Sequence, residues 1–281
     1  MMALKLYASC STGQSVEFFV LDFTEAFWQV PLSPSERRFF AAMLRIDGLD
    51  KFLVYLRTAQ GSRNAPLCWA RLAALIMRLT QSMFTPGTIA LHCFVDDPIA
   101  SLMGTSAERK LYVTTIMLTW EALNFQLAYH KAQFGSSVTW IGGQLTVTPE
   151  GIRGEVKQAI IEDISTALDF FLGSNVISRK ELRSFVGRAN HAAGLLVTLR
   201  PFLHAVWAAL STNNTGPTAT IWTVQVKHSL DWLRNLLSEA EPGLVRHFTL
   251  EEFTRSGITI EVGTDASPWG MGGGGWLSTE R

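Results

Sequence analysis

The sequence predicts an α+β fold in which a split βαβ, ferredoxin-like unit is followed by a helical segment and a C-terminal hairpin. Two apolar runs that end in aspartate, at Asp22 and Asp96, predict neighbouring buried strands. Past Gly151 the apolar spacing becomes that of long helices. Near the end, an alternating run up to Ser267, followed by a glycine-rich stretch, predicts two paired strands.

The first half of the chain is expected to alternate strands and helices. Asp47-Gly48 stands between two apolar runs and predicts a hairpin turn. The pair Asp96-Asp97 predicts a second turn. In chain order, the expected elements are a strand over 18–22, hairpin strands over 39–46 and 51–57, a helix over 65–84, strands over 93–95 and 99–102, a helix over 106–123, a strand around Gln133 and a strand over 138–147.

The second half is expected to be helical, over 155–172, 178–196, 201–210 and 218–238. Ser178 followed by Glu181 has the form of a capping box, which supports a helix start there. Residues 213–217 predict a linker. The stretch 178–200 carries a cluster of Arg and Lys with Glu181 as its single acid, so it could follow phosphates or simply present a solvated basic face.

Composition limits the classes of protein that fit. The chain has 281 residues, 47% hydrophobic and 17% charged, so it can bury large cores in two or three domains. Its 24 basic and 24 acidic residues give a net charge of zero, which is less basic than is usual for a nucleic-acid binder. Cys10, Cys68 and Cys93 have neither zinc-ligand spacing nor an even count, which favours a reducing, intracellular location. No apolar run suits a membrane span or a secretion signal.

The two strands that end in aspartate would bring Asp22 and Asp96 close to each other. Carboxylates so placed repel and raise each other's pKa, so a divalent cation between them is favoured. Oxygen ligands with few alternatives favour Mg²⁺, which takes waters and substrate phosphates as its remaining ligands. The pattern is typical of two-metal phosphoryl transfer, in which one ion activates a hydroxyl and the other stabilises the leaving oxygen.

Five segments, in order along the chain, resemble the palm motifs of retroelement reverse transcriptases. They are 20–32 (VLDFTEAFWQVPL), 60–66 (QGSRNAP), 94–97 (FVDD), Lys131 and 138–143 (VTWIGG). The resemblance implies a ferredoxin-like polymerase palm with partial fingers over 1–148, a helical thumb/connection over 149–245 and an incomplete ribonuclease H-like hairpin over 246–281. It also implies an RNA-directed DNA polymerase, a nucleotidyltransferase that adds deoxynucleotides to a primer.

The resemblance assigns roles to single residues around the metal. Asp22 and Asp96 would be the metal ligands and Asp97 a weaker third carboxylate, with two Mg²⁺ ions, or Mn²⁺ in their place. Lys131 would protonate the departing pyrophosphate. Taken alone, an Asp-Asp pair can be a solvated turn, Asp22 a helix cap and Lys131 an ordinary surface lysine.

The resemblance also implies a substrate side. Phe27, five residues after Asp22, would be an aromatic gate against a ribose 2′-hydroxyl, with plain core packing as the alternative. Gln60 and Gly61 would lie against the incoming nucleotide and template, and Arg63 near the template strand. The implied partners are an RNA or DNA template with primer and deoxynucleoside triphosphates, and no membrane. Few residues precede Asp22, so a segment upstream or a second chain is expected to supply the rest of the fingers.

The segment 258–277 resembles the opening hairpin of ribonuclease H, with Asp265 as its first metal carboxylate. Because one acid cannot build a two-metal site, no ribonuclease H activity is expected. Two other functions stay open. One is a decayed retroelement fragment that at most binds nucleic acid. The other is a phosphohydrolase of the haloacid dehalogenase type with Asp22 as nucleophile, which is disfavoured because Thr24 stands where that family needs a second aspartate.

Overall fold

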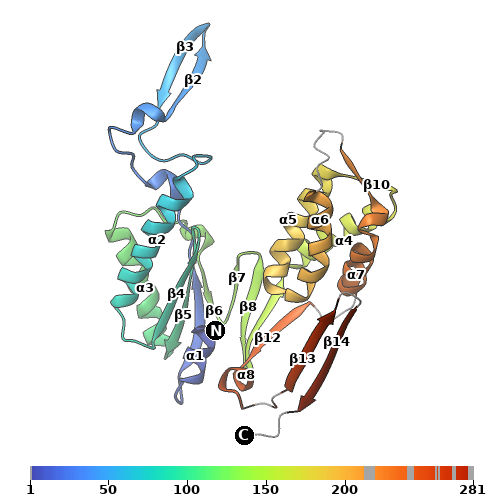
Figure 1. Ribbon diagram of the computed structural model, residues 1–281. Coiled ribbons are helices and arrows are strands. Elements are labelled where there is room, and N and C mark those ends of the chain that lie inside the picture. Colours follow the sequence, from blue (N-terminus) through green and yellow to red (C-terminus); the bar gives the residue numbers. More distant parts are fainter. Residues whose placement is uncertain are drawn as a thin grey trace.

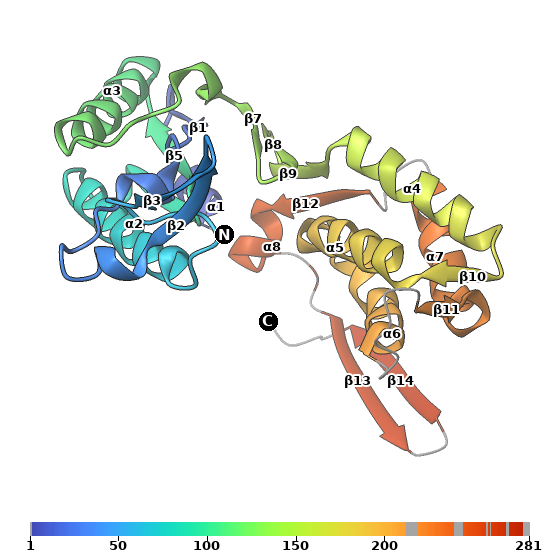
Figure 2. The same ribbon diagram turned by 90° about the horizontal axis from the view of Figure 1, so that it is seen from above.

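The computed structural model describes residues 2–211, 219–238, 244–256, 258, 260–267 and 270–277. It contains an N-terminal sheet covered by helices, a second sheet, a helical bundle and two hairpins (Figure 1). The N-terminal sheet and the bundle lie on opposite sides of the molecule, with the second sheet between them, as the turned view confirms (Figure 2).

The N-terminal sheet has the strand order β4-β5-β1-β6, and neighbouring strands are antiparallel. Its strands are β1 (Ser15–Val20), β4 (Ile89–Phe94), β5 (Asp97–Gly104) and β6 (Gln133–Gly135), with helix α2 (Ala65–Ser82) between β1 and β4 and helix α3 (Ser106–Ala122) between β5 and β6. This order is the split βαβ, ferredoxin-like plan that the sequence predicts. Both helices end within two residues of their predicted limits.

The central strands β1 and β5 of this sheet are buried on both faces, which explains their continuous apolar runs. Phe19 and Leu102 pack with α2 and α3, whereas Phe18 and Ile99 face the second sheet. Trp69 and Trp120, one from each helix, are fully buried between helices and sheet. A Thr105–Glu108 capping box, which the sequence analysis did not identify, starts α3.

Helix α1 (Met2–Ala8) was not expected from the sequence. It is too short to show a helical period, and its stability depends on packing. Leu4 and Leu6 are its buried side chains. Leu4 joins the cluster between the two sheets, so α1 closes one side of that interface.

The second sheet has the order β12-β9-β8-β7 and is antiparallel throughout. Its strands are β7 (Ser137–Trp140), β8 (Gly143–Thr148), β9 (Gly151–Val156) and β12 (Val245–Thr249). The single strand expected over 138–147 is therefore two strands. They are joined by a tight turn at Ile141 and Gly142, both with positive φ, as such turns require. The sheet joins segments that are far apart in the sequence, because β7, β8 and β9 follow one another closely whereas β12 comes after the helical bundle.

Four helices form the bundle: α4 (Gln158–Leu172), α5 (Arg179–Leu195), α6 (Arg200–Ser211) and α7 (Lys227–Ser238). Their apolar faces meet in one core that includes Leu168, Phe185, Val206 and Leu230. The helical period of the sequence arises from this core. The expected linker over 213–217 lies outside the described residues.

Three predictions about the bundle were wrong. The helix expected from residue 218 begins at Lys227, because β11 (Thr220–Trp222) pairs with β10 (Val176–Ser178) instead. The capping box at Ser178 does not form, and its side chain makes no cap hydrogen bond. Similarly, the helix expected from residue 155 starts at Gln158, because β9 takes the preceding residues into the second sheet.

The two remaining hairpins are isolated two-stranded sheets. Strands β2 (Ala41–Ile46) and β3 (Leu49–Val54) are joined at Asp47 and Gly48, as predicted, and both turn residues have positive φ. This hairpin projects away from α2 (Figure 1). Strands β13 (Ile260–Ser267) and β14 (Gly270–Leu277) form the C-terminal hairpin, which pairs with no other described strand. The side chain of Asp265 lies outside the described part of the structure.

Short elements complete the described chain. Helix α8 (Leu250–Thr254) follows β12, and the 3-10 helices are η1 (Ala26–Gln29), η2 (Arg37–Phe39), η3 (Tyr129–Lys131), η4 (Val197–Leu199) and η5 (Thr223–Gln225). All three cysteines are free. Within the described ranges, no helix combines the length and the hydropathy that a membrane crossing needs.

Candidate active site

Asp22 and Asp97 lie at the same end of neighbouring strands. β1 and β5 pair antiparallel, with Val20 opposite Ile99. Continuing that register by two residues brings Asp22 level with Asp97, the first residue of β5. Because side chains alternate along a strand, both carboxylates share the face of Val20 and Ile99, which is turned away from α2 and α3.

Asp96 lies in the turn that joins β4 to β5. Phe94 pairs with Asp97, so the two turn residues are Val95 and Asp96. The expected Asp96-Asp97 turn is thus shifted by one residue, and Asp97 belongs to the strand and not to the hairpin tip. Pro98 is tolerated as the second residue of β5.

Two tryptophan side chains bind the backbone of this turn. The indole Nε1 of Trp69, in α2, donates to the Val95 carbonyl oxygen over 2.7 Å. The indole Nε1 of Trp140, at the end of β7, donates to the Asp97 carbonyl oxygen over 3.0 Å. Neither residue was singled out from the sequence for this role, because an indole-to-carbonyl bond between distant segments leaves no local pattern.

Lys131 forms an ion pair with Asp22. Its Nζ lies 2.5 Å from Asp22 Oδ2, and the Lys131 side chain is 57% exposed against 19% for Asp22. The hydrogen bond and charge of Asp22 raise the pKa of Lys131. Asp22 is not a helix cap, since the residue that precedes η1 is Glu25. Its backbone carbonyl oxygen accepts from the amide of Ala128, just before η3.

Gln29 fixes the two segments that carry this ion pair. Its side-chain Nε2 donates to the carbonyl oxygens of Thr24 and Gln126, over 2.6 and 3.0 Å, and its Oε1 accepts from the Gln126 amide over 2.9 Å. The Thr24 amide donates to the Gln126 carbonyl over 2.9 Å. The loop after Asp22 is thereby held against the segment that leads to Lys131.

The carboxylates are close enough to affect one another's protonation. Burial, and then the charge of Asp22, raise the pKa of both Asp96 and Asp97. A backbone hydrogen bond lowers the pKa of Asp96, and the charge of Lys131 lowers the pKa of both groups. Burial and the two neighbouring aspartates raise the pKa of the Cys93 thiol to about 12, so this thiol stays protonated. The site therefore concentrates negative charge that one lysine does not balance.

The chemistry of these ligands suits Mg²⁺ bound together with substrate. Within the described part of the chain, no three or more His, Cys, Asp or Glu side chains gather closely enough to enclose a metal ion by themselves. Mg²⁺ requires only one or two carboxylates, because waters and substrate phosphates supply its other ligands. Asp22, Asp96 and Asp97 provide such oxygen ligands at one edge of the sheet.

The other residues singled out from the sequence lie in two segments next to α2. Phe27, in η1, is half-buried against the core of α2 and α3, and its carbonyl oxygen accepts from the Thr58 hydroxyl. Gln60, Gly61 and Arg63 are exposed in the loop before α2. Gly61 has a φ of +87°, which favours glycine at that position.

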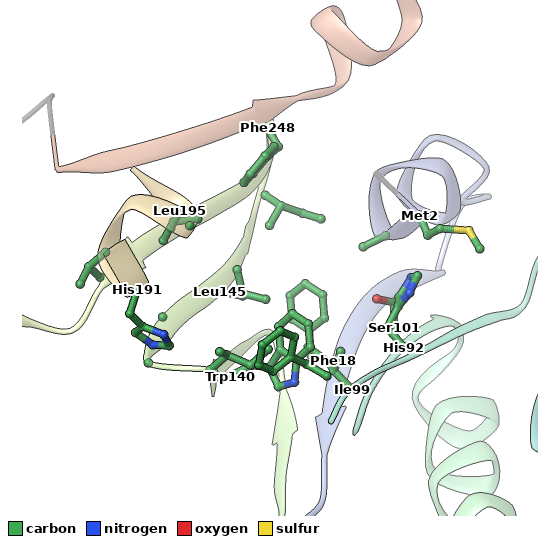
Figure 3. Close-up of a pocket in the computed structure, with 18 of the residues that line it drawn as sticks. Met2, Phe18, His92, Ile99, Ser101, Trp140, Leu145, His191, Leu195 and Phe248 are labelled. Carbon is green, nitrogen blue, oxygen red and sulfur yellow. The ribbon is translucent and has the colours of Figure 1, made fainter. Parts of the chain in front are cut away.

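A cavity of about 670 Å³ lies on the sheet face that carries Ile99. Its walls come from α1, the N-terminal sheet, the β7–β8 turn and α5, with Phe18, Trp140 and His191 among the lining residues (Figure 3). The indole of Trp140 thus stands between this cavity and the backbone of Asp97.

Comparisons with known proteins agree with the motifs. A family model described as reverse transcriptase (RNA-dependent DNA polymerase) matches residues 3–145, about half of the chain. No curated protein matches the sequence.

Two solved structures share the fold. A foamy viral protease-reverse transcriptase in complex with RNA/DNA hybrid has a TM-score of 0.56 at 17% identity, over 84% of this chain and 29% of that one. A foamy viral protease-reverse transcriptase dRH in complex with double-stranded DNA has a TM-score of 0.59 at 16% identity, over 95% of this chain and 41% of that one. The chain thus spans less than half the length of either structure.

Proposed function

Because the chain belongs to the reverse transcriptase family, we propose that it carries the catalytic palm of a retroelement RNA-directed DNA polymerase, which extends a primer with deoxynucleotides. The observation that supports this most is the gathering of Asp22, Asp96, Asp97 and Lys131 at one end of the β1–β5 pair. The proposed partners are an RNA or DNA template with its primer, and deoxynucleoside triphosphates.

In this proposal Asp22 and Asp96 hold two Mg²⁺ ions, with Asp97 as a weaker third carboxylate. When bound, the ions would activate the primer hydroxyl and stabilise the leaving oxygen. The carboxylates' own part is to stand preorganised on a buried sheet, so that they need no rearrangement as charge develops. Lys131, whose raised pKa keeps it protonated, is placed to give a proton to the departing pyrophosphate.

Substrate selection is proposed for the residues beside α2. Phe27 would exclude a ribose 2′-hydroxyl, and its half-buried ring is held by the core behind it. The exposed loop with Gln60, Gly61 and Arg63 is free to meet nucleotide and template. We propose that the bundle acts as thumb and connection, and that further fingers come from an upstream segment or a second chain.

Primer extension tests the proposal. An oligonucleotide primer on an RNA template, with deoxynucleotides and Mg²⁺, should be extended by the wild-type chain. Asp96→Asn should lower the rate by about 10²–10³-fold, as the loss of one charge-stabilising group does in other enzymes. Asp231→Asn is a matched control, since it removes an exposed carboxylate paired with Lys227 in the bundle. Extension that survives in Asp96→Asn would contradict the assignment.

A second candidate is a chain that binds nucleic acid without chemistry. The observation that favours it is that the large apolar side chains of the β2–β3 hairpin lie exposed. The described residues therefore do not hold this hairpin, on the proposed substrate side, in a fixed position. Template-primer binding by the wild-type chain, with no extension in Mg²⁺ or Mn²⁺, would favour this function over polymerisation.

We also propose that β13 and β14 are the start of a ribonuclease H-like domain, with Asp265 as its first acid. A two-metal site needs further carboxylates, so no cleavage of an RNA–DNA hybrid is expected in Mg²⁺ or Mn²⁺. Cleavage that is lost in Asp265→Asn would overturn this expectation and show that another chain completes the domain.

A further inference from the structure

The β4–β5 turn receives hydrogen bonds from two layers of the molecule. Trp69 belongs to the core between the N-terminal sheet and its helices, where its side chain is fully buried. Trp140 packs against the cluster between the two sheets. Their indole N–H groups reach the carbonyl oxygens of Val95 and Asp97, which flank Asp96 on either side. The donors thus approach the turn from opposite faces of the sheet.

This turn needs support from outside. Val95 has a φ of +58°, a left-handed conformation that is costly for a β-branched residue and persists only where the surroundings impose it. Asp97 also lies level with Asp22 across the β1–β5 pair, so carboxylates of like charge meet beside this turn. Within the turn, the Cys93 thiol also reaches the Val95 carbonyl oxygen, at 3.3 Å, but a thiol is a weak donor.

We propose that Trp69 and Trp140 are positioning residues, whose paired indole hydrogen bonds fix the Val95–Asp97 backbone and so set where the Asp96 and Asp97 carboxylates stand. The inference deepens the proposed function and depends on it only for the activity measurement. Each bond is made to the main chain, so it locates the turn and leaves the carboxylate oxygens free for ligands.

Trp140 also connects the turn to the bundle. It is followed directly by the Ile141–Gly142 turn, and Gly142 is so close to α5 that a Cβ there would lie 2.6 Å from His191 Nε2. The Gly142 carbonyl oxygen accepts from the Lys157 amide, at the start of α4. Trp140 and Gly142 therefore link the position of Asp97 to the bundle.

The test replaces each indole with a phenyl ring, which keeps an aromatic side chain and removes the N–H. The variants are Trp69→Phe and Trp140→Phe. Trp120→Phe is the matched control, because Trp120 is equally buried and its indole donates to Thr80 Oγ1 over 2.9 Å, between α3 and α2 and away from the turn. Circular dichroism and the thermal midpoint confirm folding.

The first measurement is hydrogen exchange of the metal-free protein, followed by mass spectrometry. Amides of the β4–β5 hairpin should exchange faster in Trp69→Phe and in Trp140→Phe, and at the wild-type rate in Trp120→Phe. Unchanged exchange in both Trp69→Phe and Trp140→Phe would overturn the proposal, and so would an equal acceleration in the control Trp120→Phe. If the buried Trp69→Phe does not fold, the half-buried Trp140→Phe decides the question alone.

The second measurement is Mn²⁺ binding, by electron paramagnetic resonance, with primer extension beside it. Loss of a residue that orients metal ligands typically costs about 10-fold or more in metal affinity or activity. Trp69→Phe and Trp140→Phe should therefore bind Mn²⁺ about 10-fold more weakly. Their kcat should fall by a similar factor, with KM for the nucleotide unchanged. Wild-type affinity for Mn²⁺ in both Trp69→Phe and Trp140→Phe would overturn the proposal. If even the wild type neither binds Mn²⁺ nor extends a primer, the proposed function fails. Hydrogen exchange still tests whether Trp69 and Trp140 fix the backbone of the turn.

Discussion

The strands β1 and β5 differ from β2 and β3 in what surrounds them. Both pairs are antiparallel and rich in apolar residues. In the first pair most side chains are buried, by helices on one face and by the second sheet on the other. In the second pair nearly every side chain is exposed, including Leu49 at 66% and Phe52 at 73%.

This difference separates two kinds of local order. A one-residue slip in the β1–β5 register would turn buried side chains outward, so packing fixes the relative position of Asp22 and Asp97. In β2–β3 only the turn fixes register, and an isolated two-stranded hairpin is marginally stable in water. The geometry of the carboxylates is therefore determined within the described chain, whereas the geometry of the hairpin is not.

The largest expected contrast is in stability. Leu102→Ala empties a site that is fully buried between sheet and helices and should cost about 2–5 kcal/mol of unfolding free energy. Leu49→Ala, the same substitution in the exposed hairpin, should cost less than about 0.5 kcal/mol. Urea unfolding measures both. Equal losses would show that the hairpin is packed in solution, and the comparison would fail.

A smaller effect should appear in the pH dependence of stability. Burial and the charge of Asp22 raise the pKa of Asp97 in the folded state, so the folded chain binds this proton more tightly than the unfolded chain. The ionised group then destabilises the fold above its folded-state pKa, and this penalty is absent below the unfolded value of about 3.9. Asp97→Asn should therefore raise the thermal midpoint at pH 7, with the gain shrinking toward pH 4.

Asp231→Asn serves as the control for that measurement. Its carboxylate is exposed in the bundle and paired with Lys227, so its loss should bring no gain in stability at pH 7. If the thermal midpoint rises equally in Asp97→Asn and Asp231→Asn, the cause is the change in net charge and not the crowding of carboxylates at the site.

Phe27 lies where the two regions meet, because its ring packs on the sheet's helical core and its carbonyl oxygen binds Thr58, which follows the hairpin. Phe27→Val should admit ribonucleotides, with deoxynucleotide use kept, since the proposed gate would act by steric exclusion. A shift of about 10-fold in the ratio of the two kcat/KM values is expected, which corresponds to about 1.4 kcal/mol. Primer extension with both nucleotide types measures it. An unchanged ratio would mean that Phe27 is only part of the core.

The smallest effect is expected for charge on the hairpin. Phe52→Lys should change the unfolding free energy by no more than about 0.5 kcal/mol, because the side chain is exposed. It should reduce self-association, which light scattering would detect, since uncovered apolar strand edges are sites of aggregation. A large loss of stability would place Phe52 in a packed interface.

The N-terminal sheet and its helices could be predicted from the sequence, because the strands are continuous apolar runs and the helices have a helical apolar period. The ferredoxin-like order, both covering helices and the Asp47-Gly48 turn appear as expected. Sequence reasoning failed where tertiary pairing overrides local pattern. β11 and the last two residues of β9 were assigned to helices, because β11 pairs with β10 and β9 with β12, which lie far away in the sequence.

The same limit applies to the candidate site. The motifs indicated Asp22, Asp96, Asp97 and Lys131, and the structure brings these four together, with Asp97 moved from the turn into β5. The supports of the site, Trp69 and Trp140, were missed as such. An indole that only packs in a core and an indole that also donates to the backbone of a turn have the same sequence signature.

The Lys131–Asp22 pair would affect the approach of the proposed nucleic-acid template. A template is a polyanion, and three uncompensated carboxylates would repel it over about a Debye length, roughly 8 Å at physiological salt. Lys131 neutralises one of the three while its own side chain stays largely exposed. The carboxylate site therefore presents a weaker barrier to a phosphate backbone than its aspartates alone would create, in a chain whose net charge of zero offers no general attraction.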